Sequence, residues 1–141
     1  MLPEVDWKSG SSQRGQKLFE RLSCAKCHGG RRALGPDLIG VTRRFSRDDL
    51  IAAIVEPNRD ISPRYQTTTI VTTSGKVYTG LIVYQAIDGV LLRDADHKTY
   101  RIEGADIESQ EVQRSSLMPS GLLRNTTPEE LADLMSYLET Q

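Results

Sequence analysis

Apolar residues recur at helical spacing in three segments of the chain. In each segment, large apolar side chains follow one another at intervals of three and four residues, which places them on one face of a helix. This pattern predicts helices over residues 12–22, over residues 46–55 and from residue 127 to near the C-terminus. The predicted apolar faces are Leu18, Phe19 and Leu22, then Leu50, Ile51, Ile54 and Val55, and finally Leu131, Leu134, Met135 and Leu138.

The same segments carry signals that start and stop helices. Ser46 stands three residues before Asp49, as in a capping pair, and Pro57 ends the second helix. In the last helix, residues 127–130 (Thr-Pro-Glu-Glu) place threonine at the N-cap, proline in the first turn and glutamate at the third position. Gly15 lies inside the first apolar face, where glycine costs about 1 kcal/mol relative to alanine. We therefore expect the first and last helices to cross closely at Gly15 and Tyr137.

Between residues 65 and 112 the pattern changes to alternation. Runs of β-branched and aromatic residues are separated by turn signals, among them Ser74-Gly75 and Asp88-Gly89. They predict a small antiparallel meander. The predicted fold class is therefore mainly α, with an antiparallel β insert over residues 65–112 between the second helix and a loop that contains Met118. The runs are residues 65–73, 77–87, 90–93 and 99–102.

The segment Cys24-Ala25-Lys26-Cys27-His28 carries the strongest chemical signal. C-x-x-C-H is the signature of covalent haem attachment. The two thiols add across the vinyl groups of one haem edge, and the adjacent histidine supplies an axial nitrogen to the iron. The chain has two cysteines and two histidines, and both cysteines and one histidine lie in this segment. We expect one haem c, attached to Cys24 and Cys27, with His28 as an iron ligand.

Three other interpretations of the motif are weaker. A thioredoxin-like redox pair usually follows a strand in a βαβ pattern, and none surrounds Cys24. A zinc site with two cysteines and two histidines needs histidines close together, whereas His97 is remote from His28. A disulfide between Cys24 and Cys27 would close almost no loop.

Composition and charge narrow the classes of partner. The 141 residues suit a single domain that can bury a core. The net charge is −1, so nothing favours a nucleic-acid partner or a polybasic membrane surface. No stretch is apolar enough to span a bilayer, so we expect no membrane span. Aromatic residues make up 6% of the chain, and a buried porphyrin would compensate for a core poor in aromatic rings.

The first residues lack the basic and apolar regions of a secretory signal. Thioether attachment of haem in bacteria takes place outside the cytoplasmic membrane. We therefore expect a periplasmic or otherwise exported protein, of which this sequence is a truncated or excised part. We expect residues 1–11 to form a flexible lead, in which Trp7 packs on the domain. Residues 12–141 are expected to form the haem domain, including its insert.

An electron-transfer haem with six ligands needs a second axial ligand opposite His28. Met118 lies in a loop and is followed by proline, so its thioether can point inward without breaking helical hydrogen bonds. It is the preferred candidate, although plain core filling would also suit a methionine there. Met135 falls in the apolar face of the last helix, and His97 falls in a polar turn. Met1 is a weak candidate, and an open or water-bound site is the remaining alternative.

These features together resemble class I c-type cytochromes. With the insert included, residues 12–140 resemble the planctomycete-type haem-binding cytochrome c domain. The class I resemblance rests on the first helix with Gly15 and Phe19, the motif of residues 24–28, residues 35–38 (Gly-Pro-Asp-Leu), Met118 and the last helix with Tyr137. The runs typical of the planctomycete type are residues 56–67 (EPNRDISPRYQT), 75–82 (GKVYTGLI) and 117–122 (LMPSGL).

The resemblance implies a cytochrome c fold with His28 and Met118 as axial ligands of the iron. It also implies that the carbonyl of Pro36 accepts a hydrogen bond from the axial histidine, which would fix the ring and raise its basicity. Ordinary class I members lack an insert such as residues 65–112. Domains of the planctomycete type often occur at the C-terminus of large exported dehydrogenase-like proteins.

The implied function is a one-electron carrier or relay, not an enzyme in its own right. Its partners would be redox proteins, among them a fused or associated dehydrogenase. Two alternatives stay open: a peroxidase-like or gas-binding haem domain with an open distal site, and a docking module built on the strand edges of the insert. Four arginines flank the haem segment and are candidates to pair with haem propionates, although a solvated basic surface explains any one of them as well. They are Arg31, Arg32, Arg43 and Arg44.

Overall fold

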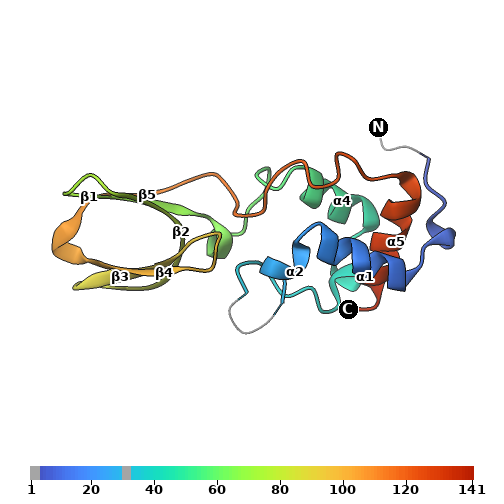
Figure 1. The fold of residues 1–141 in the computed structure, drawn as a ribbon, viewed down its shortest axis with the longest axis horizontal. Coiled ribbons are helices and arrows are strands. Elements are labelled where there is room, and N and C mark those ends of the chain that lie inside the picture. The colour runs from blue at the N-terminus through green and yellow to red at the C-terminus, as the bar shows by residue number, and fades with distance from the viewer. Residues whose placement is uncertain (1–3, 30–32) are drawn as a thin grey trace. The chain divides into compact units, whose positions relative to one another are not determined.

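The computed structural model describes residues 4–29 and 33–141. The chain divides into two compact units, the helical unit (residues 1–57 and 119–141) and the sheet unit (residues 58–118). Figure 1 shows helices in the first and strands in the second. Each unit has a hydrophobic core of its own.

The helical unit contains the three helices that the apolar pattern predicts, which are α1, α4 and α5. The predicted caps are present, because Oγ of Ser46 accepts the N–H of Asp49 and Thr127 forms a capping box with Glu130. Single turns α2 and α3 were not predicted. Across the described residues, no helix combines the length and the apolar content that crossing a bilayer requires. The elements are η1 (Trp7–Ser9), α1 (Ser12–Arg21), α2 (Cys24–Cys27), α3 (Val41–Arg44), α4 (Arg47–Val55) and α5 (Pro128–Glu139).

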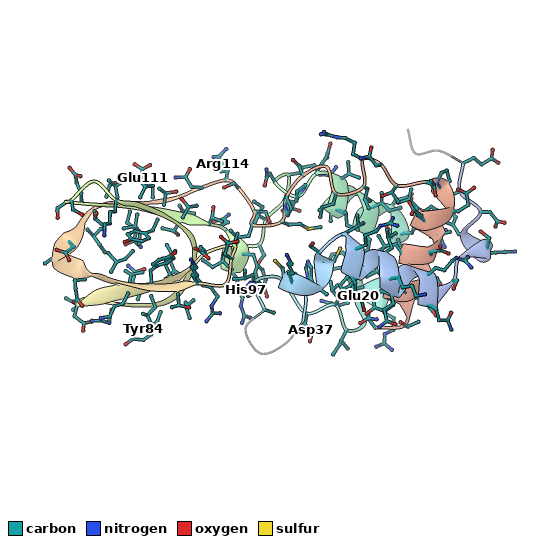
Figure 2. The ribbon with its side chains drawn as sticks, viewed as in Figure 1. Glu20, Asp37, Tyr84, His97, Glu111 and Arg114 are labelled. Carbon is teal, nitrogen blue, oxygen red and sulfur yellow. The ribbon has the colours of Figure 1, made fainter. Side chains whose placement is uncertain are left out.

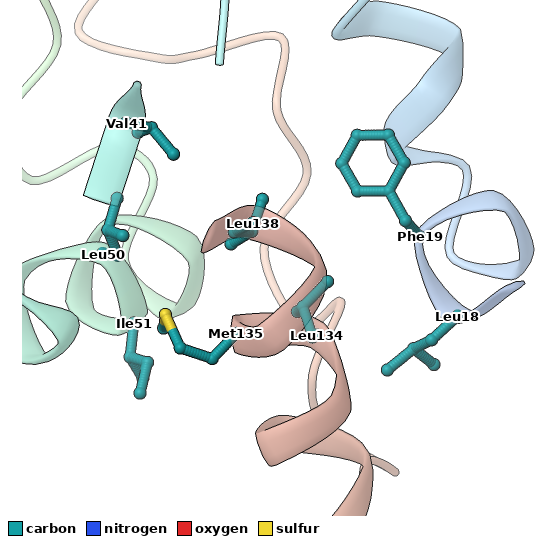
Figure 3. Close-up of a cluster of buried hydrophobic side chains, with 8 residues drawn as sticks. All are labelled: Leu18, Phe19, Val41, Leu50, Ile51, Leu134, Met135 and Leu138. Carbon is teal, nitrogen blue, oxygen red and sulfur yellow. The ribbon is translucent and has the colours of Figure 1, made fainter. Parts of the chain in front are cut away.

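The core of the helical unit is formed by side chains that converge from α1, α3, α4 and α5 (Figure 3). Met135 is 5% exposed, and its sulfur points toward α4. Met135 therefore fills the core, as its place in the apolar face predicts. Trp7 packs against the edge of this core, with the guanidinium of Arg47 4.4 Å from the centre of its ring. The buried residues are Leu18, Phe19, Val41, Leu50, Ile51, Leu134, Met135 and Leu138.

Helices α1 and α5 approach each other most closely at Gly15. A Cβ atom on Gly15 would collide with the backbone carbonyl of Asp133 and would lie 2.7 Å from Cβ of Tyr137. One turn further along α1, the ring centres of Phe19 and Tyr137 are 5.2 Å apart. The predicted crossing at Gly15 and Tyr137 is confirmed, and glycine is needed because the two backbones leave no room for a side chain.

An ion pair between the exposed Arg14 and the buried Asp133 joins the same two helices. Asp133 on α5 is 5% exposed, and its carboxylate accepts hydrogen bonds from Nε and Nη2 of Arg14, each at 2.9 Å. It also accepts the backbone N–H of Ser11, the N-cap of α1, at 2.8 Å. The hydrogen bonds from Arg14 are the main reason why the pKa of Asp133 lies below its usual range. These bonds offset the cost of burying a charged group.

The sheet unit is built around a five-stranded antiparallel sheet with the strand order β4-β3-β2-β1-β5. The first four strands form the predicted meander, but β5 returns to pair with β1, with Val112 opposite Thr68. Strand β2 pairs with β1 through its first half and with β3 through its second half. The core consists of Ile70, Val90, Leu92 and Ile102, each at most 4% exposed. The elements are η2 (Pro63–Tyr65), β1 (Thr68–Thr72), β2 (Val77–Ala86), β3 (Gly89–Arg93), β4 (Thr99–Glu103), η3 (Gly104–Asp106) and β5 (Ile107–Val112).

The prediction of a mainly α fold is wrong. Helices make up 36% and strands 23% of the structure, and the strands form a sheet with its own core. The chain is therefore a mixed α and β protein. The sequence pattern underestimated the strands because β5 is exposed over most of its length and shows little apolar periodicity.

Replacing the buried carboxylate is expected to destabilise the protein in a pH-dependent way. At neutral pH, Asp133→Asn should lower the free energy of unfolding by about 1–2 kcal/mol, because an amide cannot replace the charge-assisted hydrogen bonds from Arg14. The pKa of Asp133 is depressed in the folded state. Its contribution is therefore fully present above the unfolded-state pKa of about 3.9, and it is lost as the pH falls through the folded-state value.

Chemical denaturation of the wild type and the variant at a series of pH values from neutral to acid measures this difference. Glu139→Gln removes an exposed carboxylate from the same helix and serves as the control. A difference between wild type and Asp133→Asn that stays constant down to acid pH would contradict the assigned role.

Candidate functional site

The two cysteines of the motif lie on a single helical turn. α2 (Cys24–Cys27) follows α1 closely, and Ser23 in the connection has a left-handed backbone with φ of 66°. The spacing of three residues places both half-buried thiols on the same side of this turn. The backbone N–H of His28 donates to the carbonyl of Cys24 at 2.9 Å, so the imidazole follows directly after the turn.

The surroundings of the thiols disfavour the other interpretations of the motif. Burial raises the pKa of both Cys24 and Cys27. Cysteines of redox pairs are reactive because their pKa is lowered, so this pair has the opposite property. A zinc site is not favoured either, because the described residues contain no group of three or more histidine, cysteine, aspartate or glutamate side chains that could hold a metal ion.

The ring of His28 is held by the two residues Gly35 and Pro36. Nδ1 of His28 lies 2.9 Å from the carbonyl oxygen of Pro36. A carbonyl oxygen can only accept a hydrogen bond, so Nδ1 carries a proton, and in the neutral form of the ring Nε2 then has the lone pair. A Cβ atom on Gly35 would lie 2.7 Å from Cε1 of the ring, so the backbone of Gly35 packs against the imidazole. A neutral imidazole with a free Nε2 is the form that ligates a metal ion.

The contact of Gly35 with the imidazole was not predicted, because glycine before a proline indicates only a turn. In the structure, Nη2 of Arg44 lies 3.1 Å from the carbonyl oxygen of Asp37 and 3.2 Å from that of Ile39. Arg44, a candidate for a haem propionate, is thus engaged with the loop that follows Pro36.

A hollow of about 360 Å³ lies beside His28. Its apolar and aromatic lining includes Phe19 and Tyr137 from the contact between α1 and α5, and Leu38 and Ile39 from the loop that follows Pro36. Ile39 is 69% exposed, so this part of the lining lies at the surface. His28 lines this hollow, and the apolar part of the lining suits a flat apolar group such as a porphyrin. The other lining residues are Gly29, Ala33, Asp37 and Gln141.

The remaining candidate ligands are distributed over both units. Met118 is the last residue of the sheet unit and is half-buried, and its N–H donates to Oγ of Ser116 at 3.1 Å. His97 occupies the turn between β3 and β4 with a left-handed backbone, φ 64° (Figure 2). Met135 packs in the core of the helical unit. Three residues singled out from the sequence, Met1, Arg31 and Arg32, lie outside the described residues.

The comparison with protein families agrees with this geometry. Residues 10–71 match the family described as cytochrome C oxidase, cbb3-type, subunit III. The matched segment contains the cysteine motif, the loop with Pro36 and most of β1, and it covers less than half of the chain. No curated protein matches the chain. The match supports a c-type cytochrome, and with it a covalently bound haem c, a role in electron transfer and redox partners.

Proposed function

We propose that this protein transfers single electrons by means of one haem c, attached to Cys24 and Cys27 and ligated by His28 and Met118. The observation that carries the proposal is the state of the His28 ring, whose Nδ1 is bound to Pro36 while Nε2 is free, directly after the two cysteines. The family match over residues 10–71 supports the same function.

Each residue of the proposed site has a separate part in holding the haem. Cys24 and Cys27 attach it covalently to one helical turn, which keeps its edge at a constant place for a partner protein. The carbonyl of Pro36 orients the ring of His28 and raises its basicity. A haem held in this way supplies one-electron exchange between ferrous and ferric iron.

Met118 is the proposed second ligand on grounds of sequence and elimination. It is a loop methionine before a proline, and Met135 is occupied in the helical core. A thioether stabilises ferrous iron more than a second nitrogen ligand does, so the redox potential would be higher than with two histidines. With His28 and Met118 both as ligands, the protein would leave no position on the metal for an external substrate. This favours an electron carrier over a peroxidase or a gas-binding protein.

The partners we propose are redox proteins, among them a dehydrogenase that is fused to or associated with this chain. Cytochrome c domains are typically exported, and the periplasm is the compartment we propose. Ile39, exposed beside the hollow at His28, offers an apolar contact for such a partner.

Covalent attachment is tested by intact mass. After maturation by a haem-ligation system, the protein is expected to gain the mass of one haem, and the gain should persist under denaturing conditions because thioether bonds survive unfolding. A double variant, Cys24→Ala with Cys27→Ala, should gain none. An unmodified wild type, or a double variant that keeps the added mass, would overturn the proposal.

The second ligand is tested by absorption spectroscopy. The ferric protein is expected to show a weak red or near-infrared band that arises from a bond between sulfur and iron. Met118→Ala should abolish this band, whereas the volume-conserving Met135→Leu should keep it, because Met135 lies in the core. Tight binding of cyanide or carbon monoxide by the wild type, without such a band, would indicate the open site instead.

The contact between Gly35 and the histidine ring yields a further expectation. Gly35→Ala should force the imidazole away from Pro36, because the new Cβ would lie 2.7 Å from Cε1. We expect a loss of about 1–3 kcal/mol in the free energy of unfolding, as for other overpacked sites, together with a changed midpoint potential. Ala33→Gly, which alters the same hollow without adding an atom, is the control. A potential and a stability equal to those of the wild type would show that the ring does not depend on Gly35.

A further inference from the structure

The chain leading to Met118 is held in place although it forms no helix or strand. Residues 113–118 follow β5, and their backbone bonds to Thr67, which stands directly before β1 and is 2% exposed. Oγ1 of Thr67 lies 3.1 Å from the carbonyl oxygen of Ser115 and 2.9 Å from its Oγ. The carbonyl of Thr67 accepts the N–H of Gln113 at 2.8 Å. One buried threonine thus fixes two positions of this segment.

The next hydrogen bonds extend this arrangement as far as Met118. The N–H of Ser116 donates to Oδ1 of Asn58 at 2.8 Å, and Oγ of Ser116 accepts the N–H of Met118 at 3.1 Å. All these residues belong to the sheet unit. We call them the Thr67 network, which comprises Asn58, Thr67, Gln113, Ser115 and Ser116.

The hydroxyl of Thr67 forms hydrogen bonds in addition to filling space in the structure. Valine would fill nearly the same space, but it would leave the hydroxyl of Ser115 without this partner, and the carbonyl of Ser115 would keep the backbone N–H of Thr67 at 3.3 Å in place of two donors. Leaving buried polar groups unpaired is more costly than the net gain from the hydrogen bonds themselves. Such bonds are also directional, so they determine the course of the backbone and not only its burial.

We propose that Thr67 is a positioning residue for the distal ligand. The Thr67 network fixes residues 113–118 and thereby the place from which Met118 presents its sulfur. This inference rests on the proposed ligation by Met118. A ligand on a preordered segment rebinds quickly after a transient release, because little conformational entropy has to be lost again. The network should therefore slow the capture of external ligands by the metal.

The experiment measures how fast cyanide displaces the methionine in the haem-loaded, ferric full-length chain. Thr67→Val is expected to accelerate displacement about tenfold, while the mass of the attached haem stays unchanged. Thr67→Ser keeps the hydroxyl and should stay within about twofold of the wild type. Thr69→Val, on strand β1 directly after Thr67, breaks a different hydroxyl pair, with Thr79 at 3.0 Å, and should leave the rate unchanged.

A second variant covers the case that Thr67→Val unfolds the sheet unit. Asn58 is exposed, so Asn58→Ala removes the bond to Ser116 without opening the core, and a several-fold faster displacement is expected. Unchanged rates in both variants, with the sulfur-to-iron band lost in Met118→Ala, would overturn the positioning role and leave the ligation standing. A band that persists in Met118→Ala would overturn the ligation and the positioning role together.

Discussion

A backbone carbonyl can accept a hydrogen bond but cannot donate one, and the chemistry of this site depends on that limitation. The carbonyl of Pro36 faces Nδ1 of His28 and therefore determines where the single proton of the neutral ring resides. Nε2 is left with a lone pair beside an apolar hollow. The backbone of Gly35 closes off one side of the ring, so the imidazole has little freedom to turn away from this arrangement.

The core of the helical unit shares residues with the lining of the hollow beside His28. Phe19 and Tyr137 belong both to the contact between α1 and α5 and to the lining of the hollow beside His28. The close approach at Gly15 brings the two aromatic rings together, and the ion pair of Arg14 with Asp133 joins the same helices. A shift of α5 relative to α1 would therefore also change the lining of the hollow beside His28.

The features that the sequence predicted correctly are local ones. The apolar faces and caps of α1, α4 and α5 depend on residues within a few positions of one another, and the cysteine motif is complete within five residues. The ion pair of Arg14 with Asp133 links positions that are 119 residues apart, so it could not be predicted from the spacing of residues along the chain. A carboxylate within an apolar helix face, as at Asp133, is nevertheless a signal that could have been used.

Other features were not predictable for physical reasons. Thr67 is one of several threonines in a run, and only its burial distinguishes it from its neighbours. Strand β5 pairs with β1, although β2, β3 and β4 lie between them in the sequence. The residues of β5 are mostly exposed, so they show no alternation of apolar and polar residues that would predict a strand. The contact of Gly35 with an imidazole depends on the path of a loop, and glycine before proline is compatible with many paths.

The hydrogen bond between Ser116 and Asn58 has a consequence for the order of events during folding. For α5 to reach α1, the chain between α4 and α5 has to close into a loop, and the entropy lost in closure grows with loop length. Asn58, the first residue of the sheet unit, and Ser116, which lies two residues before its end, are joined by a bond of 2.8 Å. Pairing of β1 to β4 requires contacts mainly between strands that are neighbours in the chain. Once these strands have paired and Ser116 has bonded to Asn58, only a short loop between α4 and α5 remains to be closed. A large insertion can in this way interrupt a helical protein with little hindrance to its assembly.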